Sequence, residues 1–188
     1  MARTESFAPL LGTAAPAFSL PDVVTGELVS LDTFASRKSL LVMFICRHCP
    51  FVVHVQDELA RLGNDYAGTD AGIVAISSND AVSYPDDAPP RLKEMAESLG
   101  FRFPVCYDES QDVARAYGAV CTPDFFLYDR ERRLAYRGQL DSSRPSNQLP
   151  VDGRSLRAAI EAVRQGKPVP QPQIPSVGCS IKWKRRSN

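Results

Sequence analysis

The chain has 188 residues, which is enough for one domain with extensions and for a core that needs no disulfide staples. Its 22 basic and 22 acidic side chains cancel, so no overall field favours nucleic acid or an anionic lipid surface, and we expect neither as a partner. No apolar run approaches the roughly 20 residues that span a bilayer, and residues 1–13 lack the pattern of a secretory signal. We therefore expect a cytoplasmic protein whose five cysteines are functional thiols in a reducing compartment.

The first predicted elements are a β-hairpin and a buried strand. Two short strands, 18–20 and 27–29, are joined by a turn at Thr25–Gly26. The continuous apolar run 40–45 has the pattern of a strand that is covered on both faces. The hairpin therefore precedes the predicted core of the protein.

Two cysteines, Cys46 and Cys49, lie where this strand leads into a helix. Apolar residues recur at spacings of three and four over 52–62, which predicts an amphipathic helix that begins at or just after Cys49. A helix N-terminus carries unpaired N–H groups and about half a positive charge, so it stabilises a thiolate. We expect Cys46 to be a nucleophile with a lowered pKa and Cys49 to lie one turn inside, within reach of a disulfide. His48, when protonated, would lower the pKa of Cys46 further and make the disulfide more oxidising.

The same cysteine spacing also occurs in one half of many zinc sites. Such a site usually needs a second pair of ligands. The rest of the chain offers only the single cysteines Cys106, Cys121 and Cys179, with His54 as the only other histidine. We therefore expect no metal site and no cofactor.

The following elements alternate strands with helices. The run 72–76 is predicted as a strand parallel to 40–45, because a helix connects them. Residues 81–90 are predicted as a loop. The later predicted elements are a helix over 92–99, a short apolar piece at 103–107, a short helix over 108–117, a strand hairpin at 124–128 and 134–140, and a helix over 156–163.

This order predicts an α/β fold with a mixed central sheet, helices on both faces and an N-terminal β-hairpin extension. We place the domain at 14–166, between an N-terminal tail at 1–13 and a Pro-rich linker and Cys-containing tail at 167–188. Pro123 stands directly before an aromatic strand, where it cannot supply a ladder hydrogen bond, and we expect a cis bond before it.

Three stretches together resemble a known family: Cys46-Arg47-His48-Cys49-Pro50, residues 118–126 around Cys121-Thr122-Pro123, and residues 178–184 around Cys179. They resemble the thioredoxin fold in its peroxiredoxin-like branch, the alkyl hydroperoxide reductase/thiol-specific antioxidant or redoxin family. The resemblance covers roughly residues 14–184 and implies a thioredoxin-like fold. It also implies that Cys46 attacks, that Cys49 resolves, and that a cis Pro123 faces them.

The chain departs from the peroxiredoxin pattern at two positions. Peroxiredoxins carry Thr or Ser three residues before the peroxidatic cysteine and Pro seven before it. Here those positions, counted from Cys46, hold Met43 and Ser39. The hydroxyl that would orient a peroxide is missing there, so a peroxidase is our second hypothesis rather than our first.

Cys121, Thr122 and Cys179 are accessory candidates. Cys121 and Thr122 precede the proline that the resemblance places opposite Cys46, although Cys121 could equally be a small buried residue. Cys179 follows four prolines in residues 167–175, an extended spacer that spans about 25 Å. Cys179 could return to the active site as a resolving thiol, pair with another subunit in a homodimer, or be a passive tail residue.

Our first functional hypothesis is a thiol–disulfide oxidoreductase that acts through a mixed disulfide with a protein or small-molecule disulfide. The alternative is a thiol peroxidase with Cys46 as the peroxidatic cysteine. A third hypothesis is a thioredoxin-like metal carrier, and a fourth is a redox-inert interaction module. Either enzyme would need a thiol reductant, which the sequence does not identify.

Overall fold

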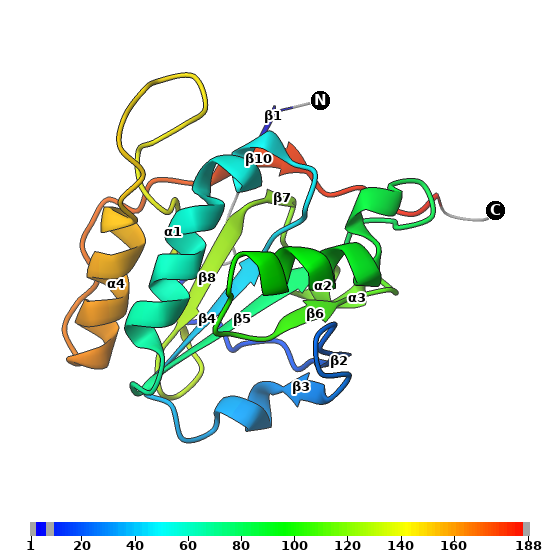
Figure 1. The fold of residues 1–188 in the computed structure, drawn as a ribbon. Coiled ribbons are helices and arrows are strands. Elements are labelled where there is room, and N and C mark those ends of the chain that lie inside the picture. Colours follow the sequence, from blue (N-terminus) through cyan, green and yellow to red (C-terminus); the bar gives the residue numbers. More distant parts are fainter. Residues whose placement is uncertain (1–2, 7–9, 186–188) are drawn as a thin grey trace.

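A five-stranded mixed sheet in the order β6-β5-β4-β8-β9 forms the centre of the computed structural model (Figure 1). The structure describes residues 3–6 and 10–185. The strands of this sheet are β4 (Ser39–Phe44), β5 (Ala71–Ser77), β6 (Val105–Tyr107), β8 (Asp124–Tyr128) and β9 (Leu134–Arg137). Strands β4, β5 and β6 are parallel, whereas β8 pairs antiparallel with both β4 and β9. The predicted mixed sheet is confirmed, and the short apolar piece at 103–107 provides its outer parallel strand.

Helices cover both faces of the sheet, as predicted. Because alternate side chains of β4 point to opposite faces, Leu41 and Met43 pack in one core cluster and Leu40 and Val42 in the other. The first cluster includes residues of α1 (Pro50–Tyr66), α2 (Pro89–Ser98) and α4 (Arg154–Arg164). The second is closed by α3 (Asp112–Tyr117), the predicted hairpin of β2 (Ser19–Pro21) and β3 (Leu28–Ser30), and the short 3₁₀ helix η1 (Leu31–Phe34).

Helix α1 begins at Pro50, so the predicted start just after Cys49 is confirmed. Its predicted apolar stripe over 52–62 is buried. Cys49 is the N-cap residue, so the expectation that it lies one turn inside is wrong. Pro50 occupies the first helical position, where its missing N–H is not needed. Among the described residues, no helix combines the length and the apolar character that crossing a bilayer requires.

A second, smaller sheet joins segments from both ends of the chain. Its order is β1 (Arg3–Glu5), β10 (Val177–Ser180) and β7 (Cys121–Thr122), with antiparallel pairing throughout. Both β1 and β10 lie in the predicted tails, because strands this short have no periodicity from which to predict them. The predicted tails at 1–13 and 167–188 also contain residues 1–2, 7–9 and 186–188, which lie outside the described residues. The boundaries of the predicted domain stay a prediction.

The Pro-rich segment 167–175 lies along the outer edge of β9. The N–H of Gln139 donates to the carbonyl of Ile174 at 2.8 Å. Gln173 accepts a bond from the N–H of Arg137 at 3.0 Å and donates one to the carbonyl of Ala135, also at 3.0 Å. These bonds satisfy backbone groups of an edge strand and lead the chain directly into β10.

Strand β10 packs so closely on β7 that position 178 has no room for a side chain. A Cβ atom built on Gly178 would lie 2.0 Å from the carbonyl oxygen of Thr122. We predict that Gly178→Ala lowers the free energy of unfolding by about 1–3 kcal/mol, the usual range for overpacking. Denaturant unfolding of the purified protein measures this. The matched control is Ser180→Ala, which we expect to change stability by less than about 0.5 kcal/mol; equal losses in both variants would contradict the steric argument.

Candidate active site

Thr122 contacts both cysteines of the Cys-x-x-Cys pair. Its hydroxyl oxygen lies 3.1 Å from the sulfur of Cys46, and its carbonyl oxygen accepts a bond from the thiol of Cys49 at 3.2 Å. The peptide bond between Thr122 and Pro123 is cis, as predicted. Cys46 and Cys49 are 1% and 0% exposed, and neither is in a disulfide. One residue from a distant strand therefore holds the two sulfurs side by side.

Cys179 joins the pair from the C-terminal segment. In the antiparallel pairing of β10 with β7, Cys179 lies opposite Thr122. The sulfur of Cys179 lies near that of Cys49, and each thiol shifts the pKa of the other. Three of the four candidate cysteines therefore meet at one place.

Cys121 is next to Thr122 in the chain but lies differently. Adjacent residues of a strand point to opposite faces, and Thr122 points to the thiol pair. The Cys121 thiol donates to the carbonyl of Pro123 at 3.8 Å. Burial raises the pKa of Cys121 well above the usual value of a thiol. It therefore has the surroundings of a packed residue.

A buried carboxylate, Asp87, closes the other side of the site. It belongs to the 3₁₀ helix η2 (Pro85–Asp87) in the predicted loop 81–90. Its Oδ1 accepts bonds from the N–H groups of Arg47 at 2.7 Å and His48 at 3.4 Å, and its Oδ2 lies 2.5 Å from Nδ1 of His48. Asn79 donates to the same Oδ2 at 2.7 Å. Asp87 thereby fixes the turn between the two cysteines.

Asp87 is not among the site residues predicted from the sequence. A signal was nonetheless present, because parallel strands bring their carboxyl ends to one edge of a sheet, where sites usually form. Cys46 follows β4, and Asp87 lies in the loop after the neighbouring parallel strand β5. Tyr84 of that loop stacks on the ring of His48, with centroids 5.5 Å apart.

The predicted pKa pattern of the pair needs correction. The neighbouring Cys49 thiol, burial and the nearby Asp87 carboxylate raise the pKa of Cys46. The neighbouring thiol of Cys46, with that of Cys179 and the nearby Val52 N–H, lowers the pKa of Cys49 to about 5. Cys49 holds the charge because it caps the helix, and the positive charge that His48 was expected to add is offset by Asp87. The two thiols share a proton, so acidity belongs to the pair and not to Cys46 alone.

Cys46, His48 and Asp87 also form the one group in the described chain with the ligand types and closeness of a metal site. Their ligand atoms lie within 4.8 Å of one another. Both oxygens of Asp87 already accept hydrogen bonds from Arg47, His48 and Asn79. A metal ion would have to displace these bonds, so the group is better described as a satisfied polar network.

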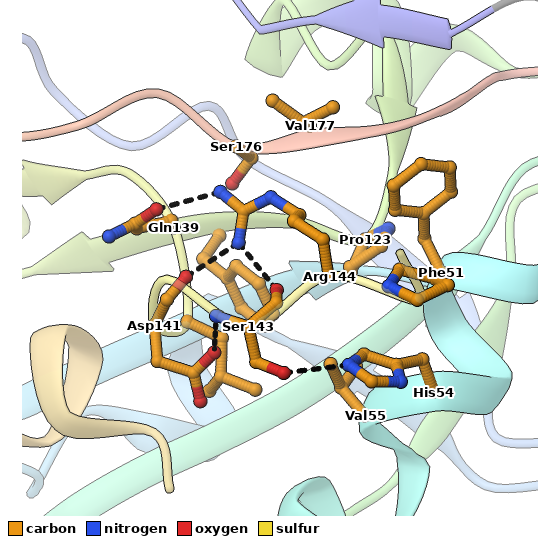
Figure 2. Close-up of a pocket in the computed structure, with 13 residues that line it drawn as sticks. Phe51, His54, Val55, Pro123, Gln139, Asp141, Ser143, Arg144, Ser176 and Val177 are labelled. Atoms are coloured by element: carbon orange, nitrogen blue, oxygen red, sulfur yellow. Dashed lines mark hydrogen bonds between the residues drawn. The ribbon is translucent and has the colours of Figure 1, made fainter. Parts of the chain in front are cut away.

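A small pocket adjoins Pro123, between α1 and the loop after β9 (Figure 2). It encloses about 20 Å³, about the room of one water molecule. Arg144 fills it and donates to the carbonyls of Asp141 at 2.7 Å and Ser143 at 2.6 Å (Figure 2). His54 of α1 bonds the hydroxyl of Ser143 at 2.8 Å. His54 therefore holds the loop after β9 against α1.

The fold and the thiol site define a thioredoxin-fold protein with a redox-type cysteine pair. The Redoxin family model matches residues 10–151, and the chain belongs to the Redoxin family.

Three known proteins illustrate this similarity. The crystal structure of an uncharacterized conserved protein from Geobacillus kaustophilus is 53% identical, covers 100% of this chain and 99% of its own, and superposes with a TM-score of 0.97. A curated Mycobacterium tuberculosis protein, whose name places it among the peroxiredoxins, is 27% identical over 63% of this chain and 69% of its own. The thioredoxin domain of a Bacteroides vulgatus thiol-disulfide oxidoreductase shares the fold, with 21% identity, a TM-score of 0.63, and coverage of 83% and 99% of the two chains.

We predict that Asp87→Asn lowers the pKa of Cys46, because it removes a buried negative charge that opposes the thiolate. Asn keeps an oxygen to accept the backbone bonds. The protein is alkylated at a series of pH values from 5 to 10, and the extent of alkylation of Cys46 is read by mass spectrometry of its peptide. We expect the pH profile of this alkylation to shift to lower pH by about one pH unit. Asp86→Asn is the matched control, because the Asp86 side chain is 70% exposed. An unchanged profile in Asp87→Asn would show that the carboxylate does not act on Cys46.

Proposed function

We propose that this protein is a thiol–disulfide oxidoreductase. The Cys46 thiolate attacks one sulfur of a substrate disulfide, a mixed disulfide forms, and the first substrate thiol leaves. The Cys49 thiolate then attacks Cys46, which releases the second substrate thiol and leaves a Cys46–Cys49 disulfide. Two electrons have passed from the protein to the substrate, and a thiol reductant restores the pair.

The double contact of Thr122 with the pair carries this proposal. The Thr122 hydroxyl can donate to Cys46 while its carbonyl accepts the Cys49 proton, at 3.1 and 3.2 Å. These two contacts favour a charge on Cys46 with the proton on Cys49, whereas the N-terminus of α1 favours the charge on Cys49, so the proton can pass between the two sulfurs during the reaction. Thr122 thus stabilises the attacking Cys46 thiolate, and we propose that the substrate backbone lies beside the neighbouring Pro123.

Substrate access requires a local opening, because Cys46 is 1% exposed. The segment that bonds the turn at Arg47 and His48 is the loop of Tyr84 and Asp87. We propose that this loop moves aside when a disulfide binds, as binding loops of low local stability do. A short, extended protein or peptide disulfide suits such an entrance.

A thiol peroxidase is the alternative function. The M. tuberculosis relative with a peroxiredoxin name favours it. Met43, at the position where peroxiredoxins carry a hydroxyl, is fully buried in the core. The Thr122 hydroxyl, however, offers the sulfur of Cys46 a donor from another strand. In this reaction a peroxide oxidises Cys46 to a sulfenic acid, and Cys49 condenses with it to give the disulfide and water.

The proposed partners are a disulfide substrate and a thiol reductant in a reducing compartment, for which the cytoplasm remains our proposal. Two neighbouring thiols can be kept reduced only where glutathione- or thioredoxin-type reductants act. A homodimer stays a prediction.

We predict that Cys46→Ser reduces insulin disulfides only at the background rate, because the attacking sulfur is gone. Cys49→Ser should instead accumulate a mixed disulfide with the substrate, visible by mass spectrometry of the intact protein. Cys106→Ala, which alters a packed cysteine on the other face of the sheet, is the control and should keep wild-type activity.

The same preparations separate the two enzyme hypotheses. Peroxide consumption in the presence of dithiothreitol, with insulin reduction at background, would replace the oxidoreductase by the peroxidase. Wild-type insulin reduction by Cys46→Ser would remove Cys46 from the mechanism altogether.

A further inference from the structure

The C-terminal segment brings a third thiol to the second cysteine of the pair rather than to the first. Cys179 lies opposite Thr122, whose carbonyl accepts a bond from the Cys49 thiol at 3.2 Å and whose hydroxyl lies 3.1 Å from the Cys46 sulfur. All three cysteines belong to one buried cluster, and Cys179 is 4% exposed. Cys179 and Cys49 also shift each other's pKa, which places the three sulfurs in the order Cys46, Cys49, Cys179.

Several contacts outside the thiols fix Cys179 in this place. Strand β10 is paired on one side with β1 and on the other with β7. Gly178 lies against the Thr122 carbonyl with no room for a side chain. After the strand, the N–H of Ile181 donates to the carbonyl of Val120 at 3.0 Å, and that of Lys182 to Asn79 Oδ1 at 2.8 Å. A passive tail residue would not need such anchoring.

We propose that Cys179 is a third redox thiol that moves the disulfide from Cys46–Cys49 to Cys49–Cys179. This inference rests on the proposed function, which supplies the Cys46–Cys49 disulfide. It assigns Cys179 to a step inside one chain, because Cys179 lies opposite Thr122 in the same buried cluster as Cys46 and Cys49.

The step is an exchange without net oxidation. The Cys179 sulfur attacks the sulfur of Cys49, a Cys49–Cys179 bond forms and the Cys46–Cys49 bond breaks. The bonding electron pair leaves on Cys46, which takes up the proton that Cys179 loses. Burial raises the pKa of Cys179 to about 12, so this proton is transferred only as Cys46 accepts it. Two thiols of the external reductant later open the Cys49–Cys179 disulfide.

The consequence is that Cys46 is free again while the protein still holds one oxidising disulfide. A free Cys46 can form a mixed disulfide with a second substrate, and Cys49 resolves that mixed disulfide after the reductant has opened the Cys49–Cys179 bond. The disulfide is then held between Cys49 and Cys179, away from the proposed entrance at Cys46. Substrate and reductant therefore do not compete for the same sulfur atom.

Tryptic peptides distinguish these disulfides directly. Cleavage after Arg47 separates Cys46, in residues 39–47, from Cys49, in residues 48–61, and Cys179 lies in residues 165–182. The experiment exposes the reduced, full-length protein to excess oxidised glutathione, quenches it with acid, alkylates free thiols and maps the linked peptides. We expect residues 48–61 linked to 165–182 and an alkylated Cys46. In Cys179→Ser we expect residues 39–47 linked to 48–61 instead.

The outcomes separate the two proposals. A wild-type protein that contains only the Cys46–Cys49 link, with Cys179 alkylated, overturns the relay but leaves the proposed function intact. A protein that forms no disulfide, or whose Cys46→Ser variant reduces insulin at the wild-type rate, overturns the proposed function itself. Links between two chains would show a partner role for Cys179 and overturn the intramolecular step.

Two further variants guard against a folding artefact. Cys121→Ala changes a buried cysteine next to Thr122 that points away from the pair, and the Cys49–Cys179 link should form in it as in the wild type. Cys179→Ala tests whether any effect of Cys179→Ser arises from a buried hydroxyl, since both variants should give the same Cys46–Cys49 link. The wild-type map decides the proposal even if a variant fails to fold.

Discussion

The arrangement of the site depends on one contact, that of Thr122 with the two thiols of Cys46 and Cys49. The thiols come from the turn between β4 and α1, whereas Thr122 comes from a strand more than 70 residues later. Its position is set by the pairing of β7 with β10 and by the buried pair of Asp124 and Arg137 directly after it, at 3.3 Å. The hydroxyl of Ser6 donates to the same carboxylate at 2.8 Å and ties the N-terminal segment to this corner. Segments from both ends of the chain therefore hold the redox site together.

The electrostatics of the site follow from a competition between two nearby groups. The N-terminus of α1 favours a negative sulfur, and Cys49 receives most of this effect because it caps the helix. The buried carboxylate of Asp87 opposes a negative charge on Cys46. One negative charge can therefore lie on either sulfur, and the position of the proton decides which sulfur is the nucleophile at a given step.

The residues around Cys46 bear on which of the two thiol reactions we propose for this chain. The sheet residue Met43 is too deeply packed to assist a peroxide, and the available hydroxyl comes from the strand that also carries the cis proline. The C-terminal strand brings a third cysteine, Cys179, opposite Thr122 in the same buried cluster. These features support our proposal of exchange among disulfides, because they bring three sulfur atoms together.

The sequence by itself determined the local parts of this protein. Apolar runs identified β4 and β5, the three-and-four spacing identified α1, and the strand-to-helix junction placed Cys46 and Cys49 where their chemistry would be tuned. It did not identify Asp87, the shared proton or the strands β1 and β10, because each depends on residues far apart in the chain. The loop of Asp87 has no periodic pattern, and its role arises only because parallel strands end at the same edge of the sheet. The spacer before Cys179 suggested a return to the active site, but only the antiparallel pairing with Thr122 decided that its sulfur meets Cys49. The periodicity of a segment predicts its secondary structure, whereas tertiary packing decides which distant side chains come into contact.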